Sequence, residues 1–543
     1  MKRRKPELID LSVEELDAIL ERSKAGALNA QDRDKLKALH ETHFWVVTEL
    51  EKSNASLARL RKSLSINAQK TEKTSAVLNA ENDVEAPAGS VVETIGEKAE
   101  KKKPKGHGRN GAGAYTGAER IEVPHPSLKP GDPCPECKRG KVYEQEPQRL
   151  VRLRGQAPIP ATLLELQRVR CNLCGEVFTA APPAGVGEKK YDETSASMIG
   201  LLKYGSGLPF NRLARLERSF GIPLPASTQW GIVEPAAMVL MPAYQELIWT
   251  GAQGDIFHHD DTSMKILALL KENRRIEQEG TKERTGMFTS GVVAIWKEHR
   301  IALFFTGRQH AGENLKDVLA KRAAELGRPI QMCDGSSRNE PEDLDTILAN
   351  CLTHGRRKFV EVTESFPREC RHVLEVLRQV YKNDAETKKR GMSPKRRLRY
   401  HKAHSAALMR DLKSWMNQQL ADRQVEPNSA LGEAFSYMLK RWKKLTLFLR
   451  KAGAPLDNNI CERALKKVIL HRKNALFYKT TKGALVGDVF MSLIYTAELC
   501  GANPFDYLTE LQKHADQMRN APQEWMPWNY RETLAELAEA ATA

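Results

Sequence analysis

The sequence predicts a multidomain α+β protein with an α/β core. Its 543 residues are more than one hydrophobic core normally supports. Two acids follow short apolar runs typical of buried strands: Asp260 in IFHHDDTSMKIL and Asp334 in PIQMCDGSS. A third acid, Glu462, lies in a segment with helical spacing. Acids of this kind on two strands and a helix suit a site for two divalent cations, because hard cations prefer carboxylate oxygens held by rigid elements.

The order of the expected elements indicates an RNase H-like core with an all-helical insertion. After the strand with Asp260, FTSGVVAIWK and RIALFFTG predict a hairpin around Glu298 and His299. AGENLKDVLAKRAAEL predicts an amphipathic helix, and the next strand ends at Asp334. The interval that follows is too long for such a core and is largely helical over residues 367–451. We therefore expect a helical insertion there.

The N-terminal region predicts helices and a short coiled coil. Leu50, Leu57 and Leu64 repeat every seven residues, and Val46 and Leu60 occupy the alternate seam position. Such heptads favour dimerisation through a coiled coil. The alternative is an amphipathic helix that packs against its own chain.

Residues 68–118 lack hydrophobic periodicity and read as a flexible linker. A basic cluster lies among its glycines and comprises Lys101, Lys102, Lys103, Lys105 and Arg109. An extended arm of this kind can follow the phosphate backbone of DNA. A solvated tether is the alternative.

Two CxxC pairs predict a small zinc-binding domain. Their cysteines are Cys134, Cys137, Cys171 and Cys174. Each pair can present two thiolates to one tetrahedral ion, and four thiolates leave no open position, so we expect one structural Zn²⁺. RVRCNLCGEVFTA predicts a strand, a metal knuckle and a second strand. A redox dithiol is the alternative to zinc.

Charge and composition favour a polyanionic partner. The formal net charge is +16. No apolar run reaches the length of a membrane span, and the N-terminus lacks the apolar core of a secretory signal. We expect a cytoplasmic, nucleoid-associated protein with no membrane partner. Residues 208–240 fit a helix-turn-helix that contacts DNA, although ordinary helix packing gives the same pattern.

The neighbours of the three acids suggest further contacts. Asp260 and Asp261 cannot both point at one site, because strand side chains alternate, and local chemistry does not choose between them. Glu462 shares a helix face with Asn458, Asn459 and Lys466, so a solvated Glu–Lys pair is the alternative to metal binding. Two basic clusters could hold DNA phosphates: Arg356 and Arg357 in CLTHGRRKF, and Arg472 and Lys473 after the glutamate.

Several motifs together resemble transposases of the insertion-sequence-66 family, in the DDE superfamily. HHDDTSMKIL resembles the family's DET segment, CLTHGRRKF its arginine-rich segment, and LDNNICERALKKVILHRKNALF the segment with the family glutamate. KPKGHGRNG with the paired CxxC, and the C-terminal MPWNY, resemble the flanking modules. Asp261 stands where the family has glutamate, and CDGSSRNEP lacks the family's aromatic residue. Asp343 and Asp345 are therefore alternatives to Asp334 as the second acid.

The resemblance implies a DNA transposase in which Asp260, Asp334 and Glu462 bind Mg²⁺ or Mn²⁺. It also implies DNA as partner, self-association and accessory proteins of the same element. An inactive DNA-binding derivative and a nuclease that does not join strands are the alternatives. The expected boundaries are 1–67 (helical, coiled coil), 68–118 (linker), 119–185 (zinc-binding), 186–250 (helical), 251–366 and 452–490 (core), 367–451 (insertion) and 491–543 (C-terminal helical module).

Overall fold

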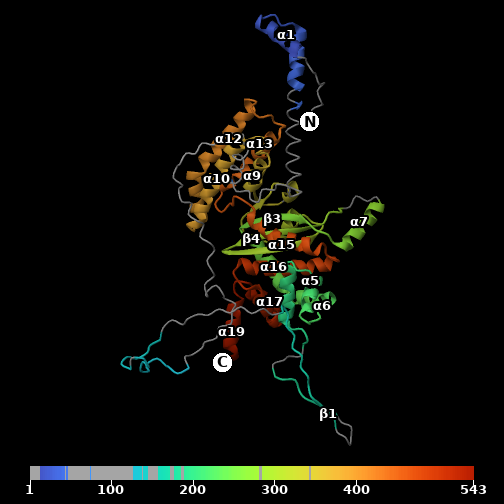
Figure 1. The fold of residues 1–543 in the computed structure, drawn as a ribbon, viewed down its shortest axis with the longest axis vertical. Coiled ribbons are helices and arrows are strands. Elements are labelled where there is room, and N and C mark those ends of the chain that lie inside the picture. The colour runs from blue at the N-terminus through green and yellow to red at the C-terminus, as the bar shows by residue number, and fades with distance from the viewer. Residues whose placement is uncertain are drawn as a thin grey trace, which may run out of the picture. The chain divides into compact units, whose positions relative to one another are not determined.

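The computed structural model describes residues 13–42, 45–46, 74, 126–136, 138–144, 157–170, 177–184, 189–279, 284–341 and 344–542. The chain forms two compact units. One consists of Met1–Glu85 and Ala161–Ala543, and the other of Ala86–Pro160. Figure 1 shows the fold of these residues.

The larger unit contains a five-stranded mixed sheet with the strand order β5-β4-β3-β6-β7. The strands are β3 (Ile256–Ser263), β4 (Phe288–Trp296), β5 (His299–Gly307), β6 (Ile330–Cys333) and β7 (Ile347–Asn350). Strands β3, β4 and β5 are antiparallel, whereas β6 pairs in parallel with β3 and β7. Because β3 and β6 are parallel, their C-terminal ends meet at one edge of the sheet.

Three details of this region differ from the expected pattern. The hairpin turns at Lys297 and Glu298, since Trp296 pairs with His299. Strand β7 was not predicted, because four residues are too few to show alternation. The helix α8 (Ala311–Leu319) is shorter than the predicted segment. The residues after α8 contact the end of the helix α6 (Ala226–Ala252) instead: Arg322 donates to the carbonyls of Ala252 and Gly254.

The outer edge of the sheet is covered by a helix rather than left open. Helix α16 (Thr481–Leu499) presents Asp488, Ser492 and Thr496 at four-residue intervals. These side chains accept hydrogen bonds from the backbone N–H groups of Thr306, Phe304 and Ala302 on β5. Four residues of helix advance about 6 Å and two residues of strand about 7 Å, so the two repeats match. The pairing capacity of an edge strand is thereby used within the chain.

Helices that precede the sheet pack against it. They are α4 (Glu193–Gly200), which continues into a π-helical turn (Leu201–Gly205), α5 (Phe210–Ser219) and α6 (Ala226–Ala252). Helix α6 contacts β4, β5 and α16 and buries one face along most of its length. Helices α5 and α6 are joined by a short connection, as a helix-turn-helix at residues 208–240 would be. However, α6 packs in the core of this unit, and DNA contact by these helices stays a prediction.

A group of helices follows β7 and lies on one side of the sheet (Figure 1). They are α9 (Leu352–Val360), α10 (Pro367–Lys389), α11 (Pro394–His404), α12 (Ala406–Ala421), α13 (Ala430–Lys440) and α14 (Trp442–Leu445), with a 3-10 turn at Leu447–Leu449. Their apolar faces share one buried cluster with β6 and β7, and this cluster includes Met332, Phe359 and Phe435. The helical segment therefore completes the core that covers the parallel strands.

The remaining helices surround the sheet or extend from it. They are α7 (Leu267–Glu279), α15 (Asn459–Ala475), α17 (Pro504–Lys513), α18 (Ala515–Asn520) and α19 (Tyr530–Thr542), with 3-10 turns at Ser337–Asn339 and Pro522–Trp525. Helix α15 packs on β3 and β4. Gly291 on β4 permits this approach, because a Cβ there would lie 3.1 Å from Leu465 Cδ2. No helix in the described part of the chain combines the length and hydropathy of a membrane span.

The N-terminal region contains α1 (Val13–Lys24) and a helical run at 30–42. Arg22 joins them through two hydrogen bonds to Asp32, of 2.9 and 2.8 Å. The heptad leucines 50, 57, 60 and 64 lie outside the described residues, so the coiled coil stays a prediction.

Candidate active site

Two of the three predicted acids converge on one amide group. Asp260 lies inside β3, two residues after the part that pairs with β6, and Asp334 directly follows β6. Asn339 Nδ2 donates to Asp260 Oδ1 at 3.3 Å and to Asp334 Oδ1 at 3.0 Å. The parallel pairing of β3 and β6 brings both acids to the same edge. The side chain of Asn339, from the turn after β6, lies between their carboxylates.

A buried hydrogen-bond network holds the backbone of Asn339, the residue that carries this amide. Gln331 Nε2 on β6 donates to the carbonyl of Asn339 at 2.9 Å and lies 3.0 Å from His259 Nε2 on β3. Thr346 Oγ1 donates to Gln331 Oε1 at 2.5 Å. Because Gln331, Asn339 and His259 are almost fully buried, the orientation of the amide is set by packing as well as by the acids.

The electrostatics of the site favour a cation. Burial, followed by the charge of Asp334, raises the pKa of Asp260 to about 7. When no cation is bound, the two carboxylates repel each other. This repulsion and the burial of Asp260 favour its protonated form. A divalent cation between these oxygens would remove the repulsion.

Asp261 belongs to different surroundings, as strand alternation predicts. Its Oδ2 lies 2.8 Å from Nδ1 of His310, the residue that precedes α8. The ring of His310 packs on Phe288 with a centroid separation of 4.0 Å. Asp261 therefore joins β3 to α8, whereas Asp260 faces Asn339.

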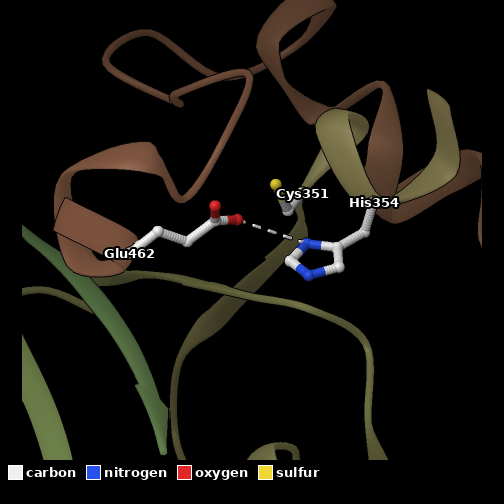
Figure 2. Close-up of side chains that lie close together, drawn as sticks. All are labelled: Cys351, His354 and Glu462. Atoms are coloured by element: carbon white, nitrogen blue, oxygen red, sulfur yellow. Dashed lines mark ion pairs between the residues drawn. The ribbon is translucent and has the colours of Figure 1, made fainter. Parts of the chain in front are cut away.

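Glu462 lies in the first turn of α15 and turns toward α9. Its Oε1 is 3.8 Å from His354 Nδ1, and its Oε2 is 4.0 Å from Arg357 Nη2. Figure 2 shows the carboxylate and the imidazole pointing toward each other, with the thiol of Cys351 beside them. The side chain of Glu462 is 25% exposed. It therefore differs from the solvated pair with Lys466 that helical spacing alone suggests.

The buried face of α15 differs from the apolar face of Ile460, Ala464 and Val468 that helical spacing predicts. Cys461, Ala464, Leu465 and Val468 are buried on the sheet, whereas Ile460 is only half-buried. Glu462 thus lies at the margin of the buried face, next to Cys461.

Asn458, expected to share the polar face of Glu462, is completely buried. Its Nδ2 donates to the carbonyl of His259 at 3.0 Å, and its Oδ1 lies 3.3 Å from His258 Nδ1. Its backbone N–H donates to Cys351 Sγ at 3.2 Å. As the residue before α15, Asn458 does not follow the helical repeat. It fixes the start of the glutamate helix to β3.

Asp334 and His354 line one cavity of about 420 Å³. The other lining residues come from the turn after β6 and from α9 and α13: Gly335, Ser336, Arg357, Lys358, Glu361, Tyr437 and Arg441. Burial lowers the pKa of His354, while the charges of Glu462 and Asp334 raise it. His354 thus lines the cavity together with Asp334 and lies beside Glu462.

Helix α13 holds the turn that carries Asp334. Tyr437 Oη donates to the carbonyl of Asp334 at 2.7 Å, and Arg441 Nη2 donates to that of Gly335 at 3.1 Å. Gly335 has a φ of +81°, a conformation that glycine adopts readily. The helical segment thus contacts the acid loop directly.

The predicted DNA-binding residues occupy different environments. Arg357 lines the cavity. Arg356 is only 9% exposed, and its Nη2 donates to Thr74 at 3.3 Å. Arg472 Nη1 donates to the hydroxyls of Thr262 and Ser263 at the end of β3, at 3.0 and 2.8 Å. Lys473 is exposed. Among these described residues, Lys473 faces solvent, Arg472 is half-buried and Arg357 lines the cavity, whereas Arg356 is buried.

Other predicted residues lie outside the described part of the chain: Lys101, Lys102, Lys103, Lys105, Arg109, Cys137, Cys171, Cys174 and Asp343. Asp345, an alternative second acid, is 82% exposed and pairs with Arg328 before β7 begins. That position is at the opposite end of the parallel strands from Asp334.

The described parts of the cysteine-rich region form tight turns. In the smaller unit, Lys138 has a φ of +56° and donates to the carbonyl of Cys134 at 2.9 Å. The Cys134 N–H donates to the carbonyl of Gly140 at 2.8 Å. In the larger unit, β1 (Arg168–Arg170) and β2 (Val177–Thr179) form an antiparallel pair on either side of the second CxxC. Zinc binding by these cysteines stays a prediction.

Sequence reasoning missed Asn339 and Tyr437 and did not assign a site role to His354. Asn339 lies five residues after Asp334 in a polar turn, and such turns commonly carry functional side chains. His354 lies in the basic segment considered for DNA contact. Tyr437 gives no local signal, because more than a hundred residues separate it from the acid it supports.

Comparison with known proteins shows which family this chain belongs to. The family model described as "Transposase IS66 family" matches residues 190–485, which include the sheet, the helical segment and all three acids. This chain belongs to the IS66 family of transposases. Membership of this family supports a transposase-type function for the chain.

Two similar proteins come from Sinorhizobium fredii. Uncharacterized protein y4jD is 29% identical over 391 residues, which cover 69% of this chain and 74% of the relative. Uncharacterized protein y4hP is 27% identical over 352 residues and 61% of each chain. No solved structure gave a significant match.

Proposed function

We propose that this chain is a DDE-type transposase that binds the ends of an insertion sequence and catalyses DNA strand cleavage and strand transfer. Membership of the IS66 family supports this function. The observation that carries it is the convergence of Asp260 and Asp334 on the amide of Asn339, just beyond the paired part of the adjacent parallel strands β3 and β6.

The strand order supports an RNase H-like core. Three antiparallel strands, β3 to β5, are followed by β6 and β7, which continue the sheet in parallel on the other side of β3. The two aspartates then belong to neighbouring strands, and Glu462 comes from a helix packed on β3. The helical segment between them is the insertion in this core.

Asp260, Asp334 and Glu462 would hold the divalent cations. The donor set fits, because oxygen ligands suit Mg²⁺ and Mn²⁺. The raised pKa of Asp260 and the buried Glu462 Oε1, which has no hydrogen bond, also fit a site built for cations. Bound cations supply Lewis-acid stabilisation of the phosphodiester and the attacking oxygen.

The residues around the acids would bind and orient the DNA. Arg357, Lys358 and Arg441 line the cavity beside Asp334, and their positive charges suit phosphate groups. Tyr437 holds the backbone at Asp334, so the carboxylate keeps its position while the strand is bound. The carboxylates act as metal ligands and need not transfer a proton themselves.

The remaining parts of the chain would serve assembly and DNA capture. We assign DNA binding to the basic arm with Lys101, Lys102, Lys103, Lys105 and Arg109, and self-association to the N-terminal heptads. The CxxC pairs would hold a structural Zn²⁺. Accessory proteins of the same element are further partners, and the cytoplasmic nucleoid is where the DNA substrate lies.

Charge removal at each acid tests this function. Asp260→Asn, Asp334→Asn and Glu462→Gln keep the size of each side chain but remove a metal ligand. We expect each variant to lose at least about a hundredfold in cleavage of a labelled element end with Mg²⁺ or Mn²⁺. DNA binding should survive, because the basic arm and the predicted zinc-binding domain are unchanged.

Asp261→Asn is the matched control. Asparagine can keep the contact with His310, so this variant should retain most activity. Full cleavage and joining by Glu462→Gln would rule out the three-acid site. Cleavage without joining by the wild-type chain would identify a nuclease instead.

A further inference from the structure

We propose that Cys351, His354 and Glu462 form a second cation site, selective for a borderline-soft transition metal such as Zn²⁺. Their ligand atoms, one from each residue, all lie within 4.8 Å of one another. The site is separate from the CxxC pairs and adjoins the proposed magnesium site, with which it shares the glutamate.

Unsatisfied polar atoms point to this site. His354 Nδ1 and Glu462 Oε1 are both buried and lack hydrogen-bond partners. They face each other at 3.8 Å, which is too far for a hydrogen bond. Buried polar atoms are nearly always paired, so two orphans aimed at one point indicate a missing ligand between them. Figure 2 shows the Cys351 sulfur beside that point.

The three residues come from rigid and independently fixed elements. Cys351 directly follows the parallel strand β7, and His354 lies within the first turn of α9. The CxxH spacing therefore places thiol and imidazole on the same side of the strand–helix junction. Glu462 is brought to them because Leu352 N–H donates to the carbonyl of Leu456, and Asn458 N–H donates to Cys351 Sγ.

The donor set selects the metal. A thiolate, an imidazole and a carboxylate are ligands of Zn²⁺ and Co²⁺, whereas Mg²⁺ takes oxygen ligands. Bond lengths of about 2.0–2.3 Å place the donors of a tetrahedral zinc roughly 3.3–3.8 Å apart. A nitrogen–oxygen pair belongs at the short end of this range, about 3.3–3.5 Å. The 3.8 Å between His354 Nδ1 and Glu462 Oε1 would therefore shorten by a few tenths of an ångström on metal binding. Arg357 approaches the other carboxylate oxygen, so Oε1 remains free for the metal.

Occupation of this site has a consequence for catalysis, which rests on the proposed function. Zn²⁺ at this site would hold the carboxylate of Glu462 toward Cys351 and His354, with Arg357 beside its other oxygen. Zn²⁺ would withdraw the carboxylate from the magnesium site, so zinc should inhibit strand cleavage even when Mg²⁺ is in large excess.

The zinc content of the full-length chain tests the proposal. Wild type, Cys351→Ser, His354→Ala and Glu462→Gln are equilibrated with Zn²⁺, desalted and analysed for zinc. The CxxC cysteines are present in every variant, so their zinc cancels in the comparison. We expect each variant to hold about one equivalent less than wild type. Cys370→Ser, which changes another fully buried cysteine, is the control and should hold the wild-type amount.

Cobalt spectra provide a second measurement. Co²⁺ added to the zinc-loaded CxxC protein should give a thiolate charge-transfer band in wild type and in Cys370→Ser. The band should be absent in Cys351→Ser. If Cys351→Ser does not fold, as judged by circular dichroism, His354→Ala and Glu462→Gln decide, because both side chains are partly exposed. Equal zinc in wild type and in all folded variants would overturn the proposal.

The two proposals can fail separately. Loss of zinc from Glu462→Gln together with unchanged magnesium-dependent cleavage would contradict the catalytic role and leave the zinc site intact. Loss of cleavage by Glu462→Gln with an unchanged zinc content would support the catalytic role and contradict the zinc site.

Discussion

At the scale of single residues, the arrangement of Asp260, Asn339 and Asp334 is the most informative part of the structure. One amide nitrogen donates to two carboxylates whose repulsion it partly offsets. In the presence of a divalent cation, the same carboxylates would have a stronger partner. The stability of the metal-free protein should therefore depend on Asn339 more than that of the metal-bound protein.

Asn339→Leu tests this dependence. Leucine has a similar size but removes the amide that both carboxylates share, while the N–H groups of Asp261 and Ser336 stay bonded to Asp260 and Asp334. Unfolding in EDTA should therefore become easier by about 1–3 kcal/mol. The loss should be smaller in Mg²⁺, which replaces the donor. Thermal unfolding of both proteins under both conditions measures the difference. In an Asp334→Asn background, the loss in EDTA should shrink, since the repulsion is gone. An equal loss in all conditions would indicate a purely structural role for Asn339.

Asp488 is a buried carboxyl with a pH-dependent cost. Burial raises the pKa of Asp488 from 3.8 to about 8, although its hydrogen bonds with Thr306 act in the opposite direction. Between these two values the folded state binds a proton that the unfolded state does not. Stability therefore falls by up to about 1.4 kcal/mol per pH unit as the pH rises from 4 to 8, and this contribution is constant above that range.

Asp488→Asn should remove this dependence. Asparagine can accept from the Thr306 N–H and donate to its hydroxyl, so the contact with β5 is kept. The variant should match wild type near pH 4 and exceed it by a few kcal/mol near pH 8. Chemical denaturation across this range measures the effect. A variant that is less stable than wild type at pH 8 would show that the charge itself stabilises the fold.

At the scale of elements, the position of the glutamate helix depends on its first residues. Helix α15 follows Asn458, whose side chain is bonded to β3, and packs closely against Gly291 of β4. These contacts set the place of Glu462, four residues after Asn458. The element that supplies the third acid is thus fixed by the strand that supplies the first.

Asn458→Ala tests whether the bonds from Asn458 to β3 position Glu462. It removes the bonds to His258 and to the carbonyl of His259, so we expect a loss of about 2–3 kcal/mol in unfolding free energy. Strand cleavage should also fall, because Glu462 loses its fixed position. The neighbouring Asn459→Ala is the control and should change stability by less than about 0.5 kcal/mol. Unchanged cleavage by a folded Asn458→Ala protein would contradict this positioning role.

At the scale of the larger unit, the helical segment from α10 to α14 is part of the active-site structure. It shares a buried cluster with β6, β7 and α9, and α13 bonds to the loop with Asp334. An insertion that only occupied the surface would make neither contact.

Tyr437→Phe measures this influence. The variant loses a single hydroxyl that donates to the carbonyl of Asp334, so stability should fall by only about 1 kcal/mol. Cleavage should fall on the order of tenfold, because small displacements of a catalytic group are costly. Cleavage rates and thermal unfolding of the same preparations provide both values. A loss of stability without a loss of rate would show that the segment does not position the acid.

The charge of the whole chain leads to a last prediction. With a formal net charge of +16, DNA binding should weaken steeply as salt rises. Replacing Lys101, Lys102, Lys103 and Lys105 with glutamine should lower affinity for all DNA sequences. It should also flatten the slope of log K against log salt by up to about 0.9 for each phosphate that the arm no longer neutralises. An unchanged slope would identify the arm as a tether.

Much of the sheet could be predicted from the sequence. The strands with Asp260 and Asp334 and the hairpin between them are long or apolar enough to give a local signal. Strand β7 has only four residues, and the end of α8 is set by bonds from Arg322 to a distant helix terminus. Such details depend on contacts that a local pattern does not contain.

The sequence by itself determined that Asp334 follows its strand and that Asp261 points away from Asp260, because burial and strand alternation are local properties. The strand of Asp260 was expected to end there, but β3 continues to Ser263. Only the tertiary structure decided which side chains meet the three acids. Asn339 bridges two of them, His354 and Cys351 meet the third, and Asn458 is buried rather than exposed. These contacts join residues up to about two hundred positions apart. Those of Glu462 arise because α9 follows β7 and α15 packs on β3 and β4.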